Sequence, residues 1–230
     1  MNIQEVNQKR AAVLWTGGKD CALALYQARL AGYKIVKLVT FIPPEATFKA
    51  HPLPVIECQA KAMGLPHQRI EIKEPYKESY KQALRNLYDK ERIGTVITGD
   101  LDQVAGYPNW IEECCQGLEM EVIKPLWKEN RSELLDRIFS LDFQVIFSCV
   151  KKTGLSIDWL GKVLDKRAVA QLKVLKRERG IDIYGEQGEY HTLVMDGPNF
   201  EQRLEVTSYK KSEKDLIMFM DIKEIKLIDK

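Results

Sequence analysis

Apolar and amphipathic segments alternate along the first half of the chain. Short apolar runs that predict strands lie at 11–15, 34–41, 67–72, 95–99 and 120–123. Apolar residues at helical spacing predict a helix directly after the first run and further helices at about 55–63, 77–90 and 109–118. Alternation of this kind favours parallel strands joined by right-handed helical crossovers. We therefore expect an α/β fold with a doubly wound parallel sheet.

The pattern changes near residue 125. A loop, an amphipathic helix and an apolar strand fill 125–150, and a charged helical stretch follows at 156–180. Beyond residue 190, apolar and polar residues alternate as they do in strands. There is no Gly/Ser-rich linker between the two parts, so we expect them to pack together as two domains, 1–127 and a smaller α+β domain at 128–230.

The composition excludes several classes of protein. The 230 residues are 45% hydrophobic and 30% charged, and their formal net charge of +2 does not indicate a nucleic-acid partner. No apolar run approaches the length of about 18 residues that spans a membrane, and the polar first ten residues predict a cytoplasmic protein without a secretory signal. The five cysteines include no Cys-x-x-Cys pair, which favours reduced thiols over disulfides or structural zinc.

The first predicted strand ends in Thr16-Gly17-Gly18-Lys19-Asp20, directly before a helix. Glycines allow a tight turn and close approach of a ligand, and the first amides of a helix have no partners within the helix. The helix dipole and the Lys19 ammonium add positive charge at the same place. The turn therefore predicts an anion site, and the alternative is a tight strand-to-helix turn with a surface lysine.

A second polar stretch, YGEQGEYHTLVMDGPNF at 184–200, leads into an apolar strand. Its Glu186, Glu189 and His191 could bind a cation, bind an amine or transfer protons. The alternative is a polar hairpin entry, in which the glycines serve turn geometry and the carboxylates cap backbone amides.

Both stretches resemble signatures that occur together in the diphthine–ammonia ligase family, whose members open with a pyrophosphate loop. TGGKDC (16–21) is similar to the pyrophosphate loop Ser-Gly-Gly-x-Asp-Ser of the N-type ATP pyrophosphatases, and GEQGEYHT (185–192) to the Gly-Glu-x-Gly-Glu-Tyr/Phe-x-Thr signature of the diphthine–ammonia ligases. Further similar segments, in the family's order, are AHPLPVIECQAKAMGLP (50–66), TGDL (98–101), KPLW (124–127) and WLGKVLD (159–165). The resemblance implies a Rossmann-like, adenine nucleotide alpha hydrolase-like ATP-binding domain at 1–127 and an acceptor-substrate domain at 128–230.

The resemblance implies an ATP-dependent amide ligase. In such enzymes a carboxylate attacks the α-phosphate of ATP, pyrophosphate leaves, and ammonia displaces AMP from the acyl-adenylate. The implied acceptor is the diphthine residue of elongation factor 2. A small cobalamin-related carboxylate is an alternative, because GEQGEYHT is closer to a bacterial branch associated with cobalamin salvage. A tRNA-modifying ATP pyrophosphatase and a nucleotide sensor without catalysis are further alternatives. Formation of a homodimer is an open alternative to a monomer.

The same resemblance implies roles for individual residues. The residues expected to bind ATP are Thr16, Gly17, Gly18, Lys19, Asp20, Cys21, Thr40 and Gly99. Mg²⁺ is expected at Asp20 and Asp100. Catalysis is assigned to Lys19, Glu186, Glu189 and His191, and substrate binding to His51, Asp100, Tyr107, Glu186, Glu189 and Thr192. Because its carboxylates would repel triphosphate, the 185–192 segment is expected to act on the acceptor or on ammonia rather than on ATP.

Three sites depart from the family pattern. Cys21 stands where the loop usually has serine, although Thr16 keeps the first hydroxyl of the loop. Tyr107-Pro108-Asn109 stands where the ligases usually have Tyr-Gln-Arg, which removes a basic side chain from the substrate side. His191 stands where eukaryal and archaeal ligases tend to carry an acidic residue.

Overall fold

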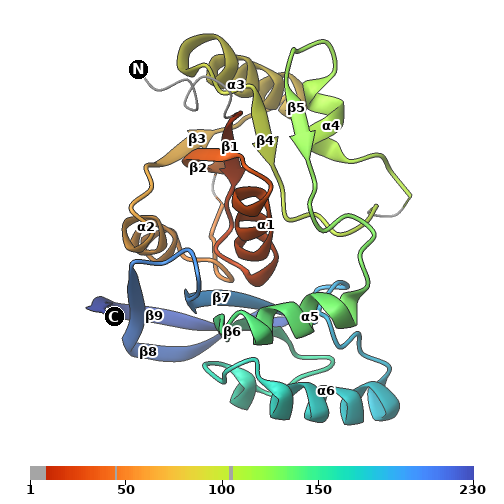
Figure 1. The fold of residues 1–230 in the computed structure, drawn as a ribbon. Coiled ribbons are helices and arrows are strands. Elements are labelled where there is room, and N and C mark those ends of the chain that lie inside the picture. Colours follow the sequence, from red (N-terminus) through yellow and green to blue (C-terminus); the bar gives the residue numbers. More distant parts are fainter. Residues whose placement is uncertain (1–8, 45, 104–105) are drawn as a thin grey trace. The chain divides into compact units, whose positions relative to one another are not determined.

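The computed structural model describes residues 9–44, 46–103 and 106–230 (Figure 1). The expectation of no secretory signal rested on the first ten residues, and residues 1–8 of these lie outside the described part. The chain divides into two compact units. The first comprises Met1–Thr16, Asp20–Ala46 and Leu65–Glu129, and the second comprises Gly17–Lys19, Thr47–Gly64 and Asn130–Lys230. The tripeptide Gly17–Lys19 therefore belongs, by its contacts, to a different unit from its neighbours in sequence.

The first unit is a parallel sheet with strand order β3-β2-β1-β4-β5. The strands are β1 (Arg10–Leu14), β2 (Lys34–Ile42), β3 (His67–Glu71), β4 (Thr95–Ile97) and β5 (Glu121–Ile123). The helices are α1 (Lys19–Leu30), α3 (Tyr76–Glu91) and α4 (Trp110–Cys115). With this strand order, right-handed crossovers place α1 on one face of the sheet and α3 and α4 on the other (Figure 1). The predicted doubly wound α/β fold is confirmed.

The core of this unit lies on both sides of its central strand. β1 is central and buried on both faces, since Ala11, Ala12 and Val13 have no exposed surface. One core cluster of this unit consists of Ala12, Val39, Leu84, Leu87, Ile93, Val96, Ile111, Cys114 and Cys115. All five strands are parallel, so their carboxyl ends meet at one edge of the sheet, where ligands bind in folds of this type.

The second unit is built on an antiparallel sheet with strand order β7-β6-β9-β8. The strands are β6 (Gln144–Lys151), β7 (Tyr190–Asp196), β8 (Gln202–Lys214) and β9 (Ile217–Asp229). The helices are α2 (Leu53–Ala62), α5 (Arg131–Ser140), α6 (Lys166–Arg179) and a short 3-10 helix (Ile157–Trp159). Helix α2 contacts β8 and β9. The predicted α+β part is therefore present and carries a sheet of its own, although this unit is not the smaller of the two, since it also includes Gly17–Lys19 and Thr47–Gly64.

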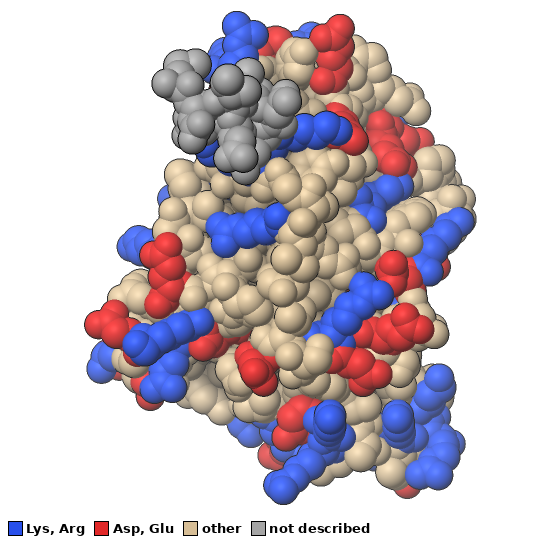
Figure 2. All heavy atoms as spheres, in the orientation of Figure 1, with Lys and Arg blue, Asp and Glu red and all other residues tan. Residues whose placement is uncertain are grey.

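Charged residues are spread over the surface. On the face drawn in Figure 2, basic and acidic side chains are interspersed, and basic side chains gather over α6. The basic residues of the last turns of α6 are exposed, which fits a solvated helix face. Within the described ranges, no helix has both the length and the apolar character needed to cross a membrane.

Candidate active site

The loop that follows β1 begins in the first unit, where hydrogen bonds fix its direction. The amide of the buried Trp15 donates to the carbonyl of Val39 at 2.7 Å. The Thr40 hydroxyl donates to the carbonyl of Trp15 at 2.7 Å and lies 2.9 Å from Nε2 of His67. Thr40, which we expected to bind ATP, thus orients the start of the loop. His67 is a partner that the sequence did not single out.

The first turn of α1 lies against the end of β4. A Cβ atom at Gly99 would be 2.6 Å from the amide nitrogen of Cys21 and 2.8 Å from the carbonyl carbon of Asp20, so a side chain has no room here. The Thr16 hydroxyl donates to Sγ of Cys21 at 3.5 Å. Four of the expected ATP-binding residues therefore meet at the N-terminus of α1, where the helix dipole favours an anion.

Asp100 follows β4 and is held through one of its carboxylate oxygens. Oδ2 accepts hydrogen bonds from Oγ1 of Thr98 at 2.8 Å and from Nδ2 of Asn109 at 2.6 Å. Oδ1 of Asn109 accepts the amides of Ile111 and Glu112 at 3.1 Å each, which caps the N-terminus of α4. Asn109, one of the departures from the family pattern, thus connects Asp100 to α4.

The donor set fits a magnesium ion that binds together with a nucleotide. Among the described residues, no cluster of three or more His, Cys, Asp or Glu side chains could hold a metal ion. Mg²⁺ is commonly held by one or two carboxylates together with substrate phosphates and water. Asp20 and Asp100 can supply such carboxylates near the sheet edge. Tyr107, expected to bind substrate, is 72% exposed and lies in the connection between β4 and α4 that also contains Asp100 and Asn109.

An apolar pocket of about 340 Å³ lies elsewhere on the first unit. Its lining consists of Pro43, Ile72, Tyr76, Tyr80 and Trp110. Pro43 and Ile72 follow the ends of β2 and β3, which places the pocket at the carboxyl edge of the sheet. The rings of Tyr80 and Trp110 meet edge to face at 5.8 Å. The pocket has the size and lining of a site for the apolar part of a small molecule.

In the second unit, the Gly17–Lys19 tripeptide lies against β7. The carbonyl of Gly17 accepts the amide of Val194 at 3.0 Å and Nε2 of Gln59 at 2.9 Å. The amide of Lys19 donates to the Thr192 hydroxyl at 3.1 Å. Gly17 has φ of +83°, and a Cβ atom there would lie 2.5 Å from Oε1 of Gln59, so this turn requires glycine. Gln59 is fully buried and is a loop-fixing residue that the sequence did not single out.

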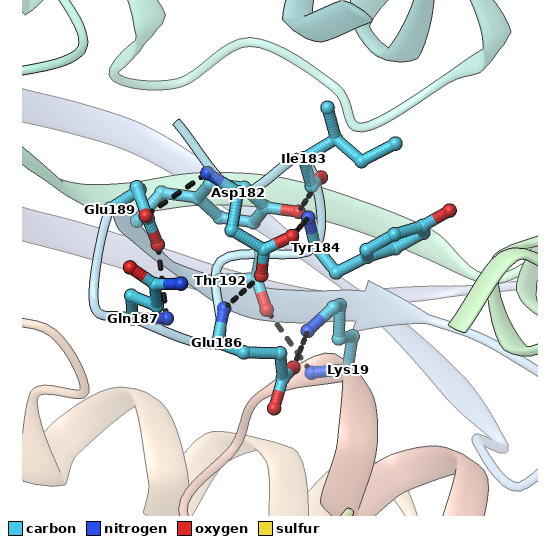
Figure 3. Close-up of polar contacts among 9 residues, drawn as sticks. Lys19, Asp182, Ile183, Tyr184, Glu186, Gln187, Glu189 and Thr192 are labelled. Carbon is cyan, nitrogen blue, oxygen red and sulfur yellow. Dashed lines mark hydrogen bonds and ion pairs between the residues drawn. The ribbon is translucent and has the colours of Figure 1, made fainter. Parts of the chain in front are cut away.

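The Lys19 side chain points toward the 182–192 segment (Figure 3). It is nearly buried, and its Nζ lies 4.0 Å from Oε1 of Glu186 and 5.9 Å from the centre of the Tyr190 ring. Lys19 and Thr192 are 173 positions apart in sequence, yet the two motifs meet here. We expected the 185–192 segment to act on the acceptor or on ammonia rather than on ATP. Glu186 and Thr192 contact Lys19 of the loop, and the chemical role of the segment stays a prediction.

Two carboxylates organise the 182–190 turn from within (Figure 3). The oxygens of Glu189 accept the amides of Asp182 at 3.1 Å and Gln187 at 3.0 Å. The oxygens of Asp182 accept the amides of Tyr184 at 3.3 Å and Glu186 at 2.9 Å. Glu189 is 8% exposed, and this geometry supports the alternative in which it caps backbone amides. Glu186 is the carboxylate of the segment that faces Lys19.

Two imidazoles of the second unit lie beside the same lysine. The rings of His51 and His191 meet edge to face at 5.3 Å. Burial is the largest cause that lowers the pKa of His51 to about 3; the neighbouring His191 ring and the Lys19 ammonium also lower it, and a hydrogen bond to the backbone of Thr192 opposes them. Although His191 keeps exposed surface, desolvation of its ring and the ammonium groups of Lys19 and Lys151 lower its pKa as well. Both imidazoles are therefore neutral at pH 7.

Three of the cysteines are buried thiols rather than activated nucleophiles. None of the five is paired in a disulfide. Burial raises the pKa of Cys114, Cys115 and Cys149 to about 11, so these thiols stay protonated at neutral pH. The site therefore combines a lysine, carboxylates and neutral imidazoles around a glycine-rich turn.

Comparison with known proteins identifies the family. The N-terminal domain of diphthamide synthase matches residues 9–122, and the diphthamide synthase C-terminal domain matches residues 130–228. The chain belongs to the diphthamide synthase family. Curated relatives named diphthine–ammonia ligase include the Homo sapiens protein, 28% identical, and the Bos taurus protein, 29% identical; each alignment covers 86% of this chain and 83% of the relative. The expected family is confirmed. The expected enzyme class, a ligase that forms a carbon–nitrogen bond, is confirmed as well.

One comparison with a solved structure concerns the fold. The chain aligns with a protein described as a predicted subunit of tRNA methyltransferase from Methanocaldococcus jannaschii DSM. The identity is 18%, the TM-score is 0.47, and the alignment covers 82% of this chain and 97% of the other. At this level of similarity the match carries no functional argument.

Proposed function

We propose that this member of the diphthamide synthase family is an ATP-dependent amide ligase that activates a carboxylate of the diphthine type and joins it to ammonia. The observation that carries the proposal is the meeting of Lys19 with Glu186 and Thr192, since it joins the two family motifs in one site. The names of the curated relatives support the class of reaction.

The turn between β1 and α1 offers the groups that a triphosphate requires. The N-terminus of α1, the Thr16 hydroxyl and the Lys19 ammonium can all stabilise negative charge on phosphate oxygens. Gly17 and Gly18 let those oxygens approach the backbone. Bound Mg²⁺ would neutralise further phosphate charge, with Asp20 and Asp100 as the carboxylates that hold it.

Glu186 is the group that an incoming phosphate would displace from Lys19. The Glu186 side chain is 32% exposed while that of Lys19 is 9% exposed, and their charged atoms are 4.0 Å apart. The distance is at the outer limit of an ion pair and Glu186 keeps contact with solvent, so the lysine can exchange the carboxylate for a phosphate without leaving its position. Thr192 keeps the lysine backbone in place during the exchange.

The second half of the reaction needs ammonia in its neutral form. The displaced Glu186 carboxylate can attract ammonium, and Glu186 or the neutral His191 can accept its proton. Glu189 supports this step by shaping the turn that carries Glu186. No protein nucleophile is required, because the acceptor carboxylate itself attacks the α-phosphate.

The products of the reaction test this proposal. The protein is incubated with ATP, Mg²⁺, ammonium and candidate acceptors, including elongation factor 2 that carries diphthine. We expect AMP, pyrophosphate and amide in equal amounts, and Lys19→Ala should lower the rate at least tenfold. Lys173→Ala, at an exposed lysine of α6 in the second unit, is the control and should leave the rate unchanged. Transfer of AMP to tRNA, or ATP binding without turnover for every acceptor, would contradict the proposal.

A further inference from the structure

We propose that Asn109 is a positioning residue for Asp100, which it holds so that the second carboxylate oxygen serves as a Mg²⁺ ligand. The inference rests on the proposed function in one respect, namely that Asp100 acts on Mg²⁺. Asn109 lies nine residues beyond Asp100, and its Nδ2 donates to Oδ2 of Asp100 at 2.6 Å. Hydrogen bonds to a charged carboxylate are short and strong, and this one has that length.

The orientation of the Asn109 amide is determined by its other contacts. Its Oδ1 accepts the amides of Ile111 and Glu112 at the start of α4. If the amide group were flipped, its NH₂ would face two N–H donors and its oxygen would face a carboxylate. The flipped form is therefore excluded, and Nδ2 must face Asp100. The same amide group of Asn109 therefore caps the helix with its oxygen and contacts Asp100 with its nitrogen.

A second contact fixes the same carboxylate oxygen from the sheet. The Thr98 hydroxyl donates to Oδ2 of Asp100 at 2.8 Å, and Thr98 is 3% exposed. The amide of Thr98 donates to the carbonyl of Ile123 at 3.0 Å, which attaches this residue to β5. Oδ2 is thus held by the sheet through Thr98 and by α4 through Asn109. Among the residues that the structure describes, none donates to Oδ1, which leaves this oxygen for a ligand.

The arrangement lowers the cost of binding a cation. A carboxylate that rotates freely loses conformational freedom when it binds a metal, whereas a carboxylate held by two donors has lost most of that freedom beforehand. Because Asn109 supplies one of the two donors, its removal should weaken the binding of Mg²⁺ rather than the binding of nucleotide as such. This distinguishes positioning from a merely structural helix cap.

The chain contains a matched control for the capping function. Asn130 caps α5 with the same geometry, since its Oδ1 accepts the amides of Ser132 at 2.9 Å and Glu133 at 3.4 Å. Within the described part of the chain, its Nδ2 donates to no carboxylate. A substitution of Asn130 therefore reports the effect of changing an asparagine cap without the Asp100 contact.

The experiment compares Asn109→Ser with Asn130→Ser. Serine keeps a capping oxygen but has no amide donor. ATP binding is measured by calorimetry at increasing MgCl₂ concentrations. We expect Asn109→Ser to raise the Mg²⁺ concentration for half-maximal ATP binding about tenfold, the scale of one charge-assisted hydrogen bond. Nucleotide affinity without Mg²⁺ should stay within about twofold, and Asn130→Ser should leave both quantities unchanged.

Further variants separate failure of this inference from failure of the proposed function. Asn109→Thr also keeps a capping oxygen and must reproduce the serine result, which guards against a folding defect. If Asp100→Asn weakens the Mg²⁺ response while Asn109→Ser matches Asn130→Ser, Asn109 only caps α4 and the inference is wrong. If Asp100→Asn itself leaves the Mg²⁺ response unchanged, the proposed role of Asp100 is wrong, and the positioning inference fails with it. If the unmodified protein binds no ATP, the proposed function is wrong.

Discussion

The amide of Lys19 donates a hydrogen bond to the hydroxyl of Thr192, which joins the glycine-rich turn to β7. Both residues are buried, with 8% and 4% of their surface exposed. A buried donor that loses its acceptor costs about 1–3 kcal/mol, because water cannot replace the lost partner. This single bond therefore couples the stability of the fold to the geometry of the proposed phosphate site.

Thr192→Val tests this coupling, because valine has nearly the same shape and lacks the hydroxyl. We expect the free energy of unfolding to fall by about 1–3 kcal/mol, measured by urea denaturation, and ATP affinity to fall as well. Thr192→Ser retains the hydroxyl and should restore most of both quantities. Equal behaviour of the valine and serine variants would mean that the hydroxyl does not hold the turn.

Glu189→Gln tests whether this carboxylate shapes the 182–190 turn. Both of its oxygens accept backbone amides, so a glutamine would place an NH₂ group against one N–H donor. We expect a loss of about 1–3 kcal/mol in unfolding free energy, seen as a lower melting temperature. A variant with unchanged stability and a hundredfold lower rate of amide formation would instead assign Glu189 to proton transfer.

Glu186→Gln is the matched change on the same turn. The Glu186 carboxylate faces Lys19 at 4.0 Å and is partly exposed, so its ion pair contributes little to stability. We therefore expect an unchanged melting temperature, together with equal or tighter ATP binding because a competing anion is removed from Lys19. Amide formation should fall. Weaker ATP binding by this variant would show that Glu186 does not compete with phosphate.

The pKa of His51 predicts how stability depends on pH. In the folded protein the pKa is lowered to about 3 from its ordinary 6.5, so between these values the unfolded chain binds the proton and the folded protein does not. Stability from this source is present above pH 6.5 and is lost as the pH falls toward 3. Measured by urea denaturation, the free energy of unfolding should fall between pH 7 and pH 5 by about 2 kcal/mol more in the unmodified protein than in His51→Asn. Equal losses in the two proteins would mean that His51 is not buried as a neutral ring.

Much of the fold follows directly from the sequence pattern. The apolar run at 11–15 and the alternation after it predict a central strand within a parallel sheet, since only strands buried on both faces are uniformly apolar. The Thr-Gly-Gly-Lys-Asp sequence likewise predicts the turn before α1, because glycine readily adopts the positive φ that Gly17 has. Asn109 also carries a readable signal, as an asparagine directly before a helix.

Other features of the site depend on contacts that no local pattern contains. The hydrogen bond between Lys19 and Thr192 joins residues that are far apart in sequence, so the residues around either one do not predict it. The amide contacts of Glu189 show a further limit, since a buried glutamate that caps a turn and a glutamate that moves a proton look alike in sequence. Gln59 and His67 became visible as loop-fixing residues only through their partners in the fold.

The most direct test of the account follows oxygen atoms through the reaction. An acceptor whose carboxylate is labelled with ¹⁸O is incubated with the protein, ATP, Mg²⁺ and ammonium, and the nucleotide product is analysed by mass spectrometry. If the carboxylate attacks the α-phosphate at the Gly17–Lys19 turn, one labelled oxygen remains on the phosphorus when ammonia displaces AMP. We expect ¹⁸O in AMP. Label in inorganic phosphate alongside ADP, or amide formed with unlabelled AMP, would contradict it.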